Sequence, residues 1–282
     1  MKRRTIYYTD ELNDDFAGTN IVTKETPADY RYVRKNPLWH AAAFLLYHVV
    51  ARPFAFAWAK LRYGLRVVGR EKLRAARGKG VFLFGNHTLV AGDAFHPNLV
   101  TPGRRTYIVT GADAVSVRGL RNVVAMLGAM PLPSGRAGYR NFLAAMKSRI
   151  ARGKAIVIFP EAHIWPYYTG IRPFGSAPFL YPVTTGAPSY AITTVFSRRG
   201  ARRAPRVTLY VDGPFFPDAS LSPGAARDKL RDEVYAAMTA RAEKSECDLV
   251  TYVRAENADR AEAESAGEAG EAADGSHSFI NG

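Results

Sequence analysis

A histidine and an aspartate are the residues of this chain best suited to proton transfer. His87 lies just beyond Val81–Phe84, an apolar run with the length and β-leaning character of a buried strand, and Asp93 follows shortly after. A carboxylate within reach of an imidazole fixes its tautomer and stabilises the imidazolium that forms when a proton is taken. We therefore predict that His87 is a general base and that Asp93 orients it.

Other polar side chains follow the same kind of apolar run further along the chain. The strand predicted at Ala155–Phe159 is followed by Glu161 and His163, and the turn Gly128–Pro131 leads to Arg136. Ligands of parallel sheets gather at the carboxyl ends of the strands. We expect these residues to share one site with His87.

Predicted strands and helices alternate along the chain around these residues. Further predicted strands are Arg104–Thr110, Tyr190–Phe196 and Val207–Val211; predicted helices are Val115–Leu127, Tyr139–Arg152 and one that opens at Ser222-Pro223 and runs toward Lys244. This alternation is typical of a sheet covered by helices. The predicted fold class is α/β, with a mixed, largely parallel sheet flanked by helices.

The most apolar segment, Leu38–Ala59, has the length of a bilayer span. Arg52 and Pro53 lie in its second half, where a charge and a proline are costly. We therefore expect two short helices, split at Pro53, that dock on a membrane interface, which also favours aromatic residues such as Trp39, Tyr47 and Trp58. A buried core helix is the alternative.

The charge of the chain is strongly uneven. The formal net charge is +14, while residues 255–282 carry seven acids and one base. A field this positive attracts a polyanion: nucleic acid, an anionic membrane leaflet or a phosphorylated substrate. The predicted organisation is a polar arm (1–36), membrane-docking helices (37–63), a catalytic domain (64–254) and an acidic disordered tail (255–282). Cys247 is the only cysteine, which fits a reducing compartment.

Residues 65–215 resemble the glycerolipid acyltransferase family, whose members acylate lysophosphatidic acid and related acceptors. Four motifs carry the resemblance, in order: Asn86-His87 to Asp93, Gly128–Pro133 with Arg136, Phe159-Pro160-Glu161-Ala162-His163-Ile164, and Ala187–Tyr190; Arg172-Pro173-Phe174 follows the third. Two departures mark a variant subgroup. Five residues separate His87 from Asp93 where the family has four, and we expect Gly92 to loop the extra residue out. The Gly-Thr-Arg of the third motif is replaced.

The resemblance implies an O-acyltransferase. His87 would deprotonate a hydroxyl of a lysophospholipid or related lipid, which then attacks the thioester of acyl-CoA or acyl-carrier protein, the co-substrate; no other cofactor is expected. Implied substrate-binding residues are Asn86, Arg136, Glu161, His163 and Arg172. In the family, the arginine of the third motif helps to hold the acceptor's phosphate. Because His163 stands in that neighbourhood here and lacks the bidentate fork of arginine, that task falls to Arg172, to Arg136 or to neither. The expected location is the cytoplasmic face of the cell membrane, as a peripheral or monotopic protein.

Two other classes of function remain open from the residues alone. His87, Asp93, Glu161 and His163, with His96, have the side-chain types of a metal-dependent hydrolase, although no compact ligand spacing is present. A basic nucleic-acid binder is the third class, but no recognised nucleic-acid motif occurs. The predicted partners are membrane lipids and the acyl donor, not nucleic acid, and the oligomeric state is left open.

Overall fold

The computed structural model describes residues 4–18, 23–117, 119–200 and 204–256. The strands are β1 (Arg4–Tyr8), β2 (Arg66–Val68), β3 (Val81–Gly85), β4 (Thr106–Thr110), β5 (Ala129–Pro131), β6 (Ala155–Ile158), β7 (Ser189–Ser197), β8 (Arg206–Phe215) and β9 (Val250–Arg254). The α-helices are α1 (Pro37–Phe44), α2 (Arg52–Tyr63), α3 (Gly92–Phe95), α4 (Pro97–Val100), α5 (Arg121–Leu127), α6 (Arg136–Ala151), α7 (Leu180–Thr185) and α8 (Pro223–Ala242). The predicted acidic tail falls, from residue 257 on, outside the described residues.

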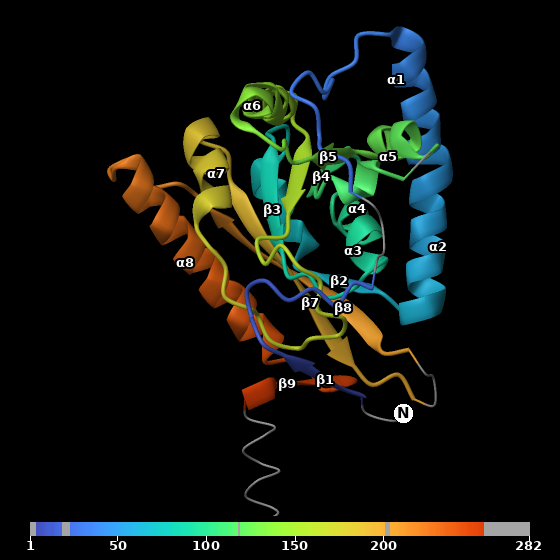
Figure 1. Cartoon of the computed structure of the whole chain (residues 1–282), viewed down its shortest axis with the longest axis vertical. Helices are drawn as coiled ribbons and strands as arrows, with labels where there is room; N and C mark the ends of the chain where they lie inside the picture. Colours follow the sequence, from blue (N-terminus) through green and yellow to red (C-terminus); the bar gives the residue numbers. More distant parts are fainter. Residues whose placement is uncertain (1–3, 19–22, 118, 201–203, 257–282) are drawn as a thin grey trace, which may run out of the picture.

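A seven-stranded sheet forms the centre of the molecule, with strand order β2-β8-β7-β3-β6-β4-β5. The five strands from β7 to β5 run parallel, and β8 pairs antiparallel with β7. Helices cover both faces, with α6, α7 and α8 on one side and α1 and α2 on the other (Figure 1). The predicted α/β class, a mixed and largely parallel sheet flanked by helices, is confirmed.

The central strand β3 is buried on both faces because its side chains alternate between two cores. Phe82 and Phe84 pack into the cluster beneath α6 and α8, while Val81 and Leu83 pack into the cluster beneath α2. All five residues of β3 are buried. The strand therefore has little freedom to shift, and whatever follows its carboxyl end is held in place.

Strands β3 and β6 are hydrogen-bonded neighbours, and their carboxyl ends lie side by side. Phe84 pairs with Ile158 at the last position of the shared register. The loops that follow these two strands therefore start from adjacent points, and they carry His87 and Glu161. The hydrogen bonds between β3 and β6 thus bring together His87 and Glu161, which are more than seventy positions apart in the sequence.

The apolar N-terminal segment is one continuous helix, Pro37–Tyr63, so the predicted split at Pro53 is wrong. A π-helical stretch, Leu45–Ala51, joins α1 to α2 and widens the turn ahead of the proline. Arg52 donates its N–H to the carbonyl of Tyr47, five residues back. Because the wider turn relieves the clash between a proline ring and the carbonyl four residues earlier, the helix continues through Pro53.

This helix has a packed face and an open face. Its inner side is lined by buried residues at helical spacing: Ala43, Tyr47, Ala55, Ala59 and Tyr63. Its outer side exposes large apolar side chains: Leu38, Phe44, Leu45, Val49, Val50, Phe54, Phe56 and Leu61. Among the described residues it is the one helix that is long and apolar enough to cross a membrane by length and composition. Tyr47, which was predicted to lie at the membrane interface, is instead buried, and its hydroxyl donates to the Asn98 side-chain oxygen inside the molecule.

The N-terminal arm is tied to the end of the chain by a second sheet that the sequence did not predict. β1 and β9 pair in parallel, from Arg4 with Val250 to Tyr8 with Arg254. After β1 the arm crosses the front of the main sheet, near the loops at its carboxyl edge (Figure 1). The arm thereby belongs to the same body as the sheet.

Candidate active site

His87 and Asp93 meet at the carboxyl end of β3. The ring Nδ1 of His87 lies 2.8 Å from the Asp93 carboxylate Oδ2. This contact assigns the ring proton to Nδ1 and leaves Nε2 as the basic nitrogen. The ring stacks on Phe159, with centroids 4.4 Å apart and planes at 15°, and its side chain keeps 17% of its surface exposed. The arrangement fixes the orientation of the imidazole and leaves part of the side chain open to solvent.

Asp93 is held in place by the loop that it partners. Its Oδ2 accepts the backbone N–H groups of Thr88 and Leu89, each at 2.9 Å, in addition to the His87 ring. The carboxylate is nearly inaccessible, with 4% of its side chain exposed. Backbone donors of this kind fix the position of a carboxylate more rigidly than a mobile side chain would.

The extra residue between His87 and Asp93 sits in an exposed turn at Val90 and Ala91. Asp93 closes the turn by donating its N–H to the carbonyl of Leu89 at 2.9 Å. The prediction that Gly92 loops outward is therefore wrong, because Gly92 is buried and begins α3. The dyad survives the longer spacing because the additional residue bulges toward solvent.

Gly92 is needed for close packing. A Cβ at this position would lie 2.8 Å from both Leu89 Cβ and His96 Cε1. We expect Gly92→Ala to lower stability by about 1–3 kcal/mol through overpacking, and to lower turnover about 10- to 100-fold because Asp93 must shift. Initial rates and urea unfolding would measure both effects. Gly224→Ala, on the open surface of α8, is the control and should be neutral; wild-type turnover in Gly92→Ala would contradict the expectation.

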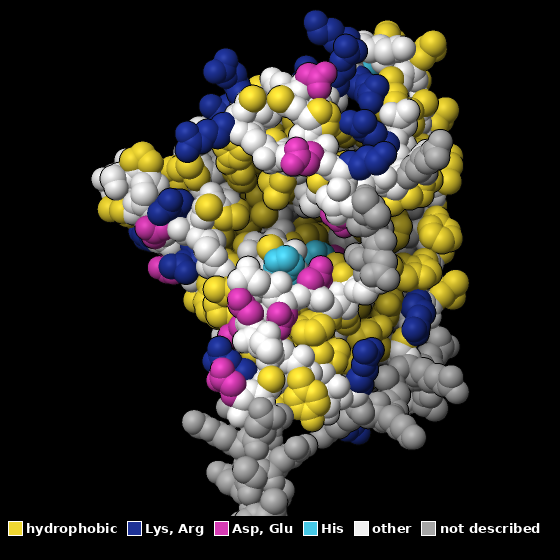
Figure 2. Space-filling view, viewed as in Figure 1, with side chains coloured by type: hydrophobic (Ala, Val, Ile, Leu, Met, Phe, Trp, Pro, Cys, Tyr) yellow, Lys and Arg dark blue, Asp and Glu magenta, His cyan; other side chains and the backbone are white. Residues whose placement is uncertain are grey.

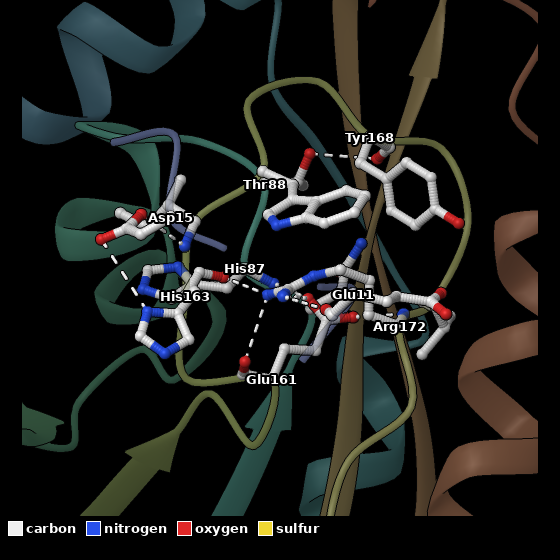
Figure 3. A network of polar contacts seen from close by, with 12 residues as sticks. Glu11, Asp15, His87, Thr88, Glu161, His163, Tyr168 and Arg172 are labelled. Atoms are coloured by element: carbon white, nitrogen blue, oxygen red, sulfur yellow. Dashed lines mark hydrogen bonds and ion pairs between the residues drawn. The ribbon is translucent and has the colours of Figure 1, made fainter. Parts of the chain in front are cut away.

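Glu161 joins the loop after β6 to the loop after β3 (Figure 3). Its Oε2 accepts the backbone N–H of His87 at 2.9 Å, and its Oε1 accepts that of Arg172 at 3.0 Å. Burial raises the pKa of this carboxyl group, while the His87 N–H and Arg172 act in the opposite direction. Glu161 thus touches the main chain of His87, not its ring.

Arg172 is enclosed beneath the same loop, with 1% of its side chain exposed. Its guanidinium lies 3.7 Å from the Glu161 carboxylate and donates to the carbonyl oxygens of Glu161, His163 and Glu11. It also lies over the ring of Trp165, 4.9 Å from the centroid. Every one of these partners of the Arg172 guanidinium group is a residue of the same chain.

Asn86 is likewise engaged by the protein itself. Its amide Nδ2 donates to the carbonyl of Thr194 at 3.1 Å, and its Oδ1 accepts the Thr194 N–H at 2.8 Å. Both ends of the side chain are thereby used to fasten the exit of β3 to the neighbouring strand β7. The arrangement positions His87, the next residue in the chain.

Segment 162–168, which follows Glu161, packs along the His87 loop. Trp165 donates its N–H to the carbonyl of His87 at 3.1 Å, and Tyr167 donates to that of Thr88 at 2.9 Å. Ala162 adopts φ 65°, in the left-handed region that glycine occupies without strain. The resembled family has glycine at this position, so the alanine takes up a conformation suited to the residue it replaces.

The N-terminal arm completes this region with residues that sequence reasoning missed. Asp14 accepts the Trp165 indole N–H on its carbonyl at 2.8 Å. The Asp15 carboxylate accepts the N–H of Ile164 at 3.2 Å and lies 3.9 Å from the His163 ring. His163 is therefore near the dyad but faces the arm (Figure 3). Nothing in the local sequence of the arm signals these contacts, since they join segments about 150 positions apart.

The remaining predicted residue, Arg136, begins α6 and is exposed. It follows β5, whose carboxyl end lies at the same edge of the sheet as those of β3 and β6. Figure 2 shows this face hollowed at its centre, with histidine and acidic side chains at the lower rim of the hollow. Whether Arg136 contacts a substrate there stays a prediction.

His96 lies behind the dyad and is almost completely buried. Its ring packs between Trp58 and Tyr63 of α2, with centroid distances of 5.8 and 5.7 Å. Within the described part of the chain neither ring nitrogen has a hydrogen-bond partner. Burial lowers the pKa of His96 to about 4, against the opposing effect of the Asp93 charge. The side chain is therefore neutral in the folded protein at physiological pH.

This burial predicts an acid sensitivity. The folded-state pKa of His96, about 4, lies below the ordinary histidine pKa of 6.5. The unfolded chain therefore binds more protons between these limits, and stability falls as pH falls through this window. The loss should reach about 3 kcal/mol near pH 4. Urea unfolding of wild type and His96→Leu at pH 7 and at pH 4.5 tests this. The variant should gain relative stability at the lower pH; an equal difference at both would contradict it.

The alternative of a metal-dependent hydrolase finds no support in the geometry. Across residues 4–18, 23–117, 119–200 and 204–256, no group of three or more His, Cys, Asp or Glu side chains is placed to hold a metal ion. The carboxylate of Glu161 is engaged by N–H groups, and the His163 ring lies toward Asp15. The predicted ligands do not converge.

Comparisons with known proteins agree with the geometry. A family model described as Acyltransferase matches residues 64–208. Among solved structures, the chain is similar to the 1-acyl-sn-glycerophosphate (LPA) acyltransferase PlsC from Thermotoga maritima, with a TM-score of 0.53, 15% identity, and coverage of 76% of this chain and 86% of that one. A search of curated proteins gave no match. The family model spans just over half of the sequence and includes the His87 and Glu161 motifs, and the chain therefore belongs to the acyltransferase family.

Proposed function

We propose that this acyltransferase moves a fatty acyl group from a thioester donor, acyl-CoA or acyl-carrier protein, to a hydroxyl of a lysophospholipid-type acceptor. The observation that carries the proposal is the 2.8 Å contact between His87 Nδ1 and Asp93 Oδ2. It leaves Nε2 as the basic nitrogen of a ring whose side chain keeps 17% of its surface exposed. Membership of the acyltransferase family supports the reaction class.

In this mechanism His87 first accepts a proton, from the acceptor hydroxyl, and later donates it, to the leaving thiolate. Nε2 takes the proton of the acceptor hydroxyl as its oxygen bonds to the thioester carbon, and Asp93 stabilises the imidazolium that results. The tetrahedral intermediate then collapses, the carbon–sulfur bond breaks, and the imidazolium returns its proton to the leaving thiolate. The products are an ester and a free thiol, and no acyl-enzyme is required.

The roles proposed for the remaining residues follow from what they touch. Glu161, Arg172 and Asn86 are positioning residues, because their polar atoms hold the main chain around His87. His163 and Arg136 are the substrate-facing candidates. His163 keeps about a third of its side chain exposed, and Arg136 is exposed at the edge where β3 and β6 end.

A lipid acceptor requires access to a membrane, and the open face of Pro37–Tyr63 provides an apolar surface for it. The inner face of this helix is buried from Ala43 to Tyr63, against α5 along its first part and against α3 and α4 along α2. A helix fastened in this way to a water-soluble body lies along the interface more readily than it crosses the bilayer. We propose peripheral attachment to the cytoplasmic face, where thioester donors are available.

The open face can be tested without disturbing the inner one. Leu45→Ser, Val49→Ser and Phe56→Ser together remove three exposed apolar side chains. Each apolar side chain that enters a membrane contributes about 1.5–3 kcal/mol, so the loss of three should weaken vesicle binding by at least about 1,000-fold. Sedimentation with lipid vesicles measures this, with the thermal unfolding midpoint as the control for folding. Unchanged binding would mean that another surface docks.

The proposed reaction is tested by product identity. Purified protein is incubated with radiolabelled acyl-CoA, or labelled acyl-carrier protein, and a panel of lysophospholipids that differ in headgroup. We expect label to appear in a diacyl product of at least one lysophospholipid. Label transferred only to water, or to none of the acceptors with either donor, would overturn the proposal.

A further inference from the structure

A second polar region lies apart from the dyad, where the N-terminal arm meets the start of α5. An open pocket of about 570 Å³ is lined there by residues of both segments. Three of them are arginines, Arg31, Arg34 and Arg121, and one is an acid, Asp29. The pocket therefore carries a net positive charge, and no step of the proposed reaction uses it.

Two of these guanidinium groups are oriented by aromatic rings. Arg34 lies 4.2 Å from the centroid of the Trp39 ring, and it donates to the Asn122 side-chain oxygen at 3.3 Å. Arg121 lies 5.1 Å from the centroid of the Tyr30 ring. Stacking leaves the N–H edges of a guanidinium group available to an anion and reduces the entropy lost on binding one.

Among the described residues, no carboxylate forms an ion pair with any of the three arginines. Within the described ranges, none of them has an Asp or Glu oxygen within 4.0 Å, although other arginines of the chain, such as Arg227 and Arg241, do. Arginine is the side chain best matched to phosphate, because its planar fork offers paired donors. The pocket thus has the chemistry of a phosphate site whose ligand comes from outside the chain.

The surroundings of the pocket indicate which phosphate. Trp39, which stacks on Arg34, lies in the first turn of α1, the start of the open apolar face. Exposed apolar side chains flank the pocket in the sequence on both segments: Val33, Leu38, Leu120 and Val123. Figure 2 shows Lys and Arg side chains gathered at the upper right, beside hydrophobic side chains along the edge where Figure 1 places α1. A soluble anion has no use for such a rim, whereas a phospholipid has both a charged and an apolar part.

We propose that Arg31, Arg34 and Arg121 bind the phosphate of an anionic phospholipid in the membrane on which the open face of Pro37–Tyr63 lies. The acyl chains of that lipid run into the bilayer beside α1, and its headgroup enters the pocket. The proposal rests on the membrane attachment proposed above. It adds selectivity for anionic lipid to an attachment that the apolar face alone would leave indifferent to headgroup.

The test compares binding to phosphatidylcholine vesicles with binding to vesicles that also contain phosphatidylglycerol. Each arginine near an anionic surface strengthens binding about fivefold, so Arg31→Gln, Arg34→Gln and Arg121→Gln together should weaken binding to the anionic vesicles about 100-fold. Binding to phosphatidylcholine should change little. The control removes the same charge elsewhere: Arg74→Gln, Arg77→Gln and Arg152→Gln, which precede β3 and β6 at the opposite edge of the sheet.

A second set of variants separates a pocket from a general positive field. Arg31→Lys, Arg34→Lys and Arg121→Lys keep the charge but lose the paired donors. If the arginines form a specific phosphate pocket, the lysine variant should bind the anionic vesicles about tenfold more weakly than the wild type. If only the overall positive charge matters, its binding should be unchanged. Far-UV circular dichroism and the unfolding midpoint verify that each variant is folded.

Several results would overturn the proposal. One is an equal loss in the control variant, and another is wild-type binding that is the same with and without phosphatidylglycerol, in which case the membrane attachment stands and the pocket does not. If the wild type binds neither kind of vesicle, both the proposed membrane attachment and the proposed phosphate pocket are wrong. If the pocket variants instead raise KM for acyl-CoA and leave vesicle binding unchanged, the phosphate belongs to the soluble donor.

Discussion

His87→Ala should lower kcat for acyl transfer by about 10³- to 10⁴-fold, because a positioned general base contributes in this range. The protein should remain folded, since the contact between position 87 and Glu161 runs through the backbone N–H. Initial rates of ester formation at saturating donor measure the loss, and the thermal unfolding midpoint verifies folding.

The dyad gives this prediction an internal control. If His87 and Asp93 act as one unit, the double variant His87→Ala/Asp93→Asn should be no slower than His87→Ala alone. Additive losses would mean that Asp93 acts independently of the ring. Near-normal turnover by His87→Ala would rule out the ring as the base.

Glu161→Ala should have the largest effect on stability. The substitution leaves the Arg172 guanidinium buried without its carboxylate and removes the acceptor of two backbone N–H groups. Breaking a buried ion pair by removal of one partner costs about 3–5 kcal/mol. In a chain of this size the unfolding midpoint should fall by roughly 10 °C, which differential scanning calorimetry measures.

Glu11→Ala is the matched control, because Arg172 binds the backbone carbonyl of Glu11 and not its side chain. Its unfolding midpoint should equal that of the wild type. If Glu161→Ala lost activity with an unchanged midpoint, Glu161 would contact substrate and its assignment as a positioning residue would be wrong.

The sequence predicted those parts of the fold that have a strong local signal. The buried strands Ala155–Ile158 and Ser189–Ser197 were predicted to within one residue at each end, because continuous apolar runs indicate such strands. β5 has three residues, too few to show an alternation of apolar and polar side chains. β9 pairs with β1, which lies at the other end of the described chain, so no local pattern indicates this pairing. Helix α5 begins six residues later than predicted, at Arg121.

The candidate site shows the same division between local and distant information. The His87 loop and Glu161 come together because the sequence places both after adjacent parallel strands, which the fold class implies. The surroundings of Arg172 were not predictable. In the sequence, Arg172 is a candidate phosphate ligand. In the structure its guanidinium group is enclosed by Glu161, Trp165 and the arm.

The N-terminal helix shows how local geometry can override a sequence rule. A proline inside an apolar helix predicts a break, and the position of Pro53 was read in that way. The π-helical turn ahead of it removes the clash. Beyond the proline the small residues Ala55 and Ala59 are buried, and α2 packs against α3 and α4. No feature of the one-dimensional pattern indicates which outcome occurs.

The proposed mechanism requires an imidazole at position 87 that carries a proton from an acceptor hydroxyl to a leaving thiolate. It is tested most directly by the simultaneous measurement of thiol release and ester formation in wild type and His87→Ala, with acyl-CoA and the lysophospholipid acceptor of highest turnover. The mechanism predicts equal amounts of thiol and ester from the wild type, and a rate of formation of both that is about 10³- to 10⁴-fold lower in the variant. Thiol released without ester, or ester formed at the wild-type rate by the variant, would contradict it.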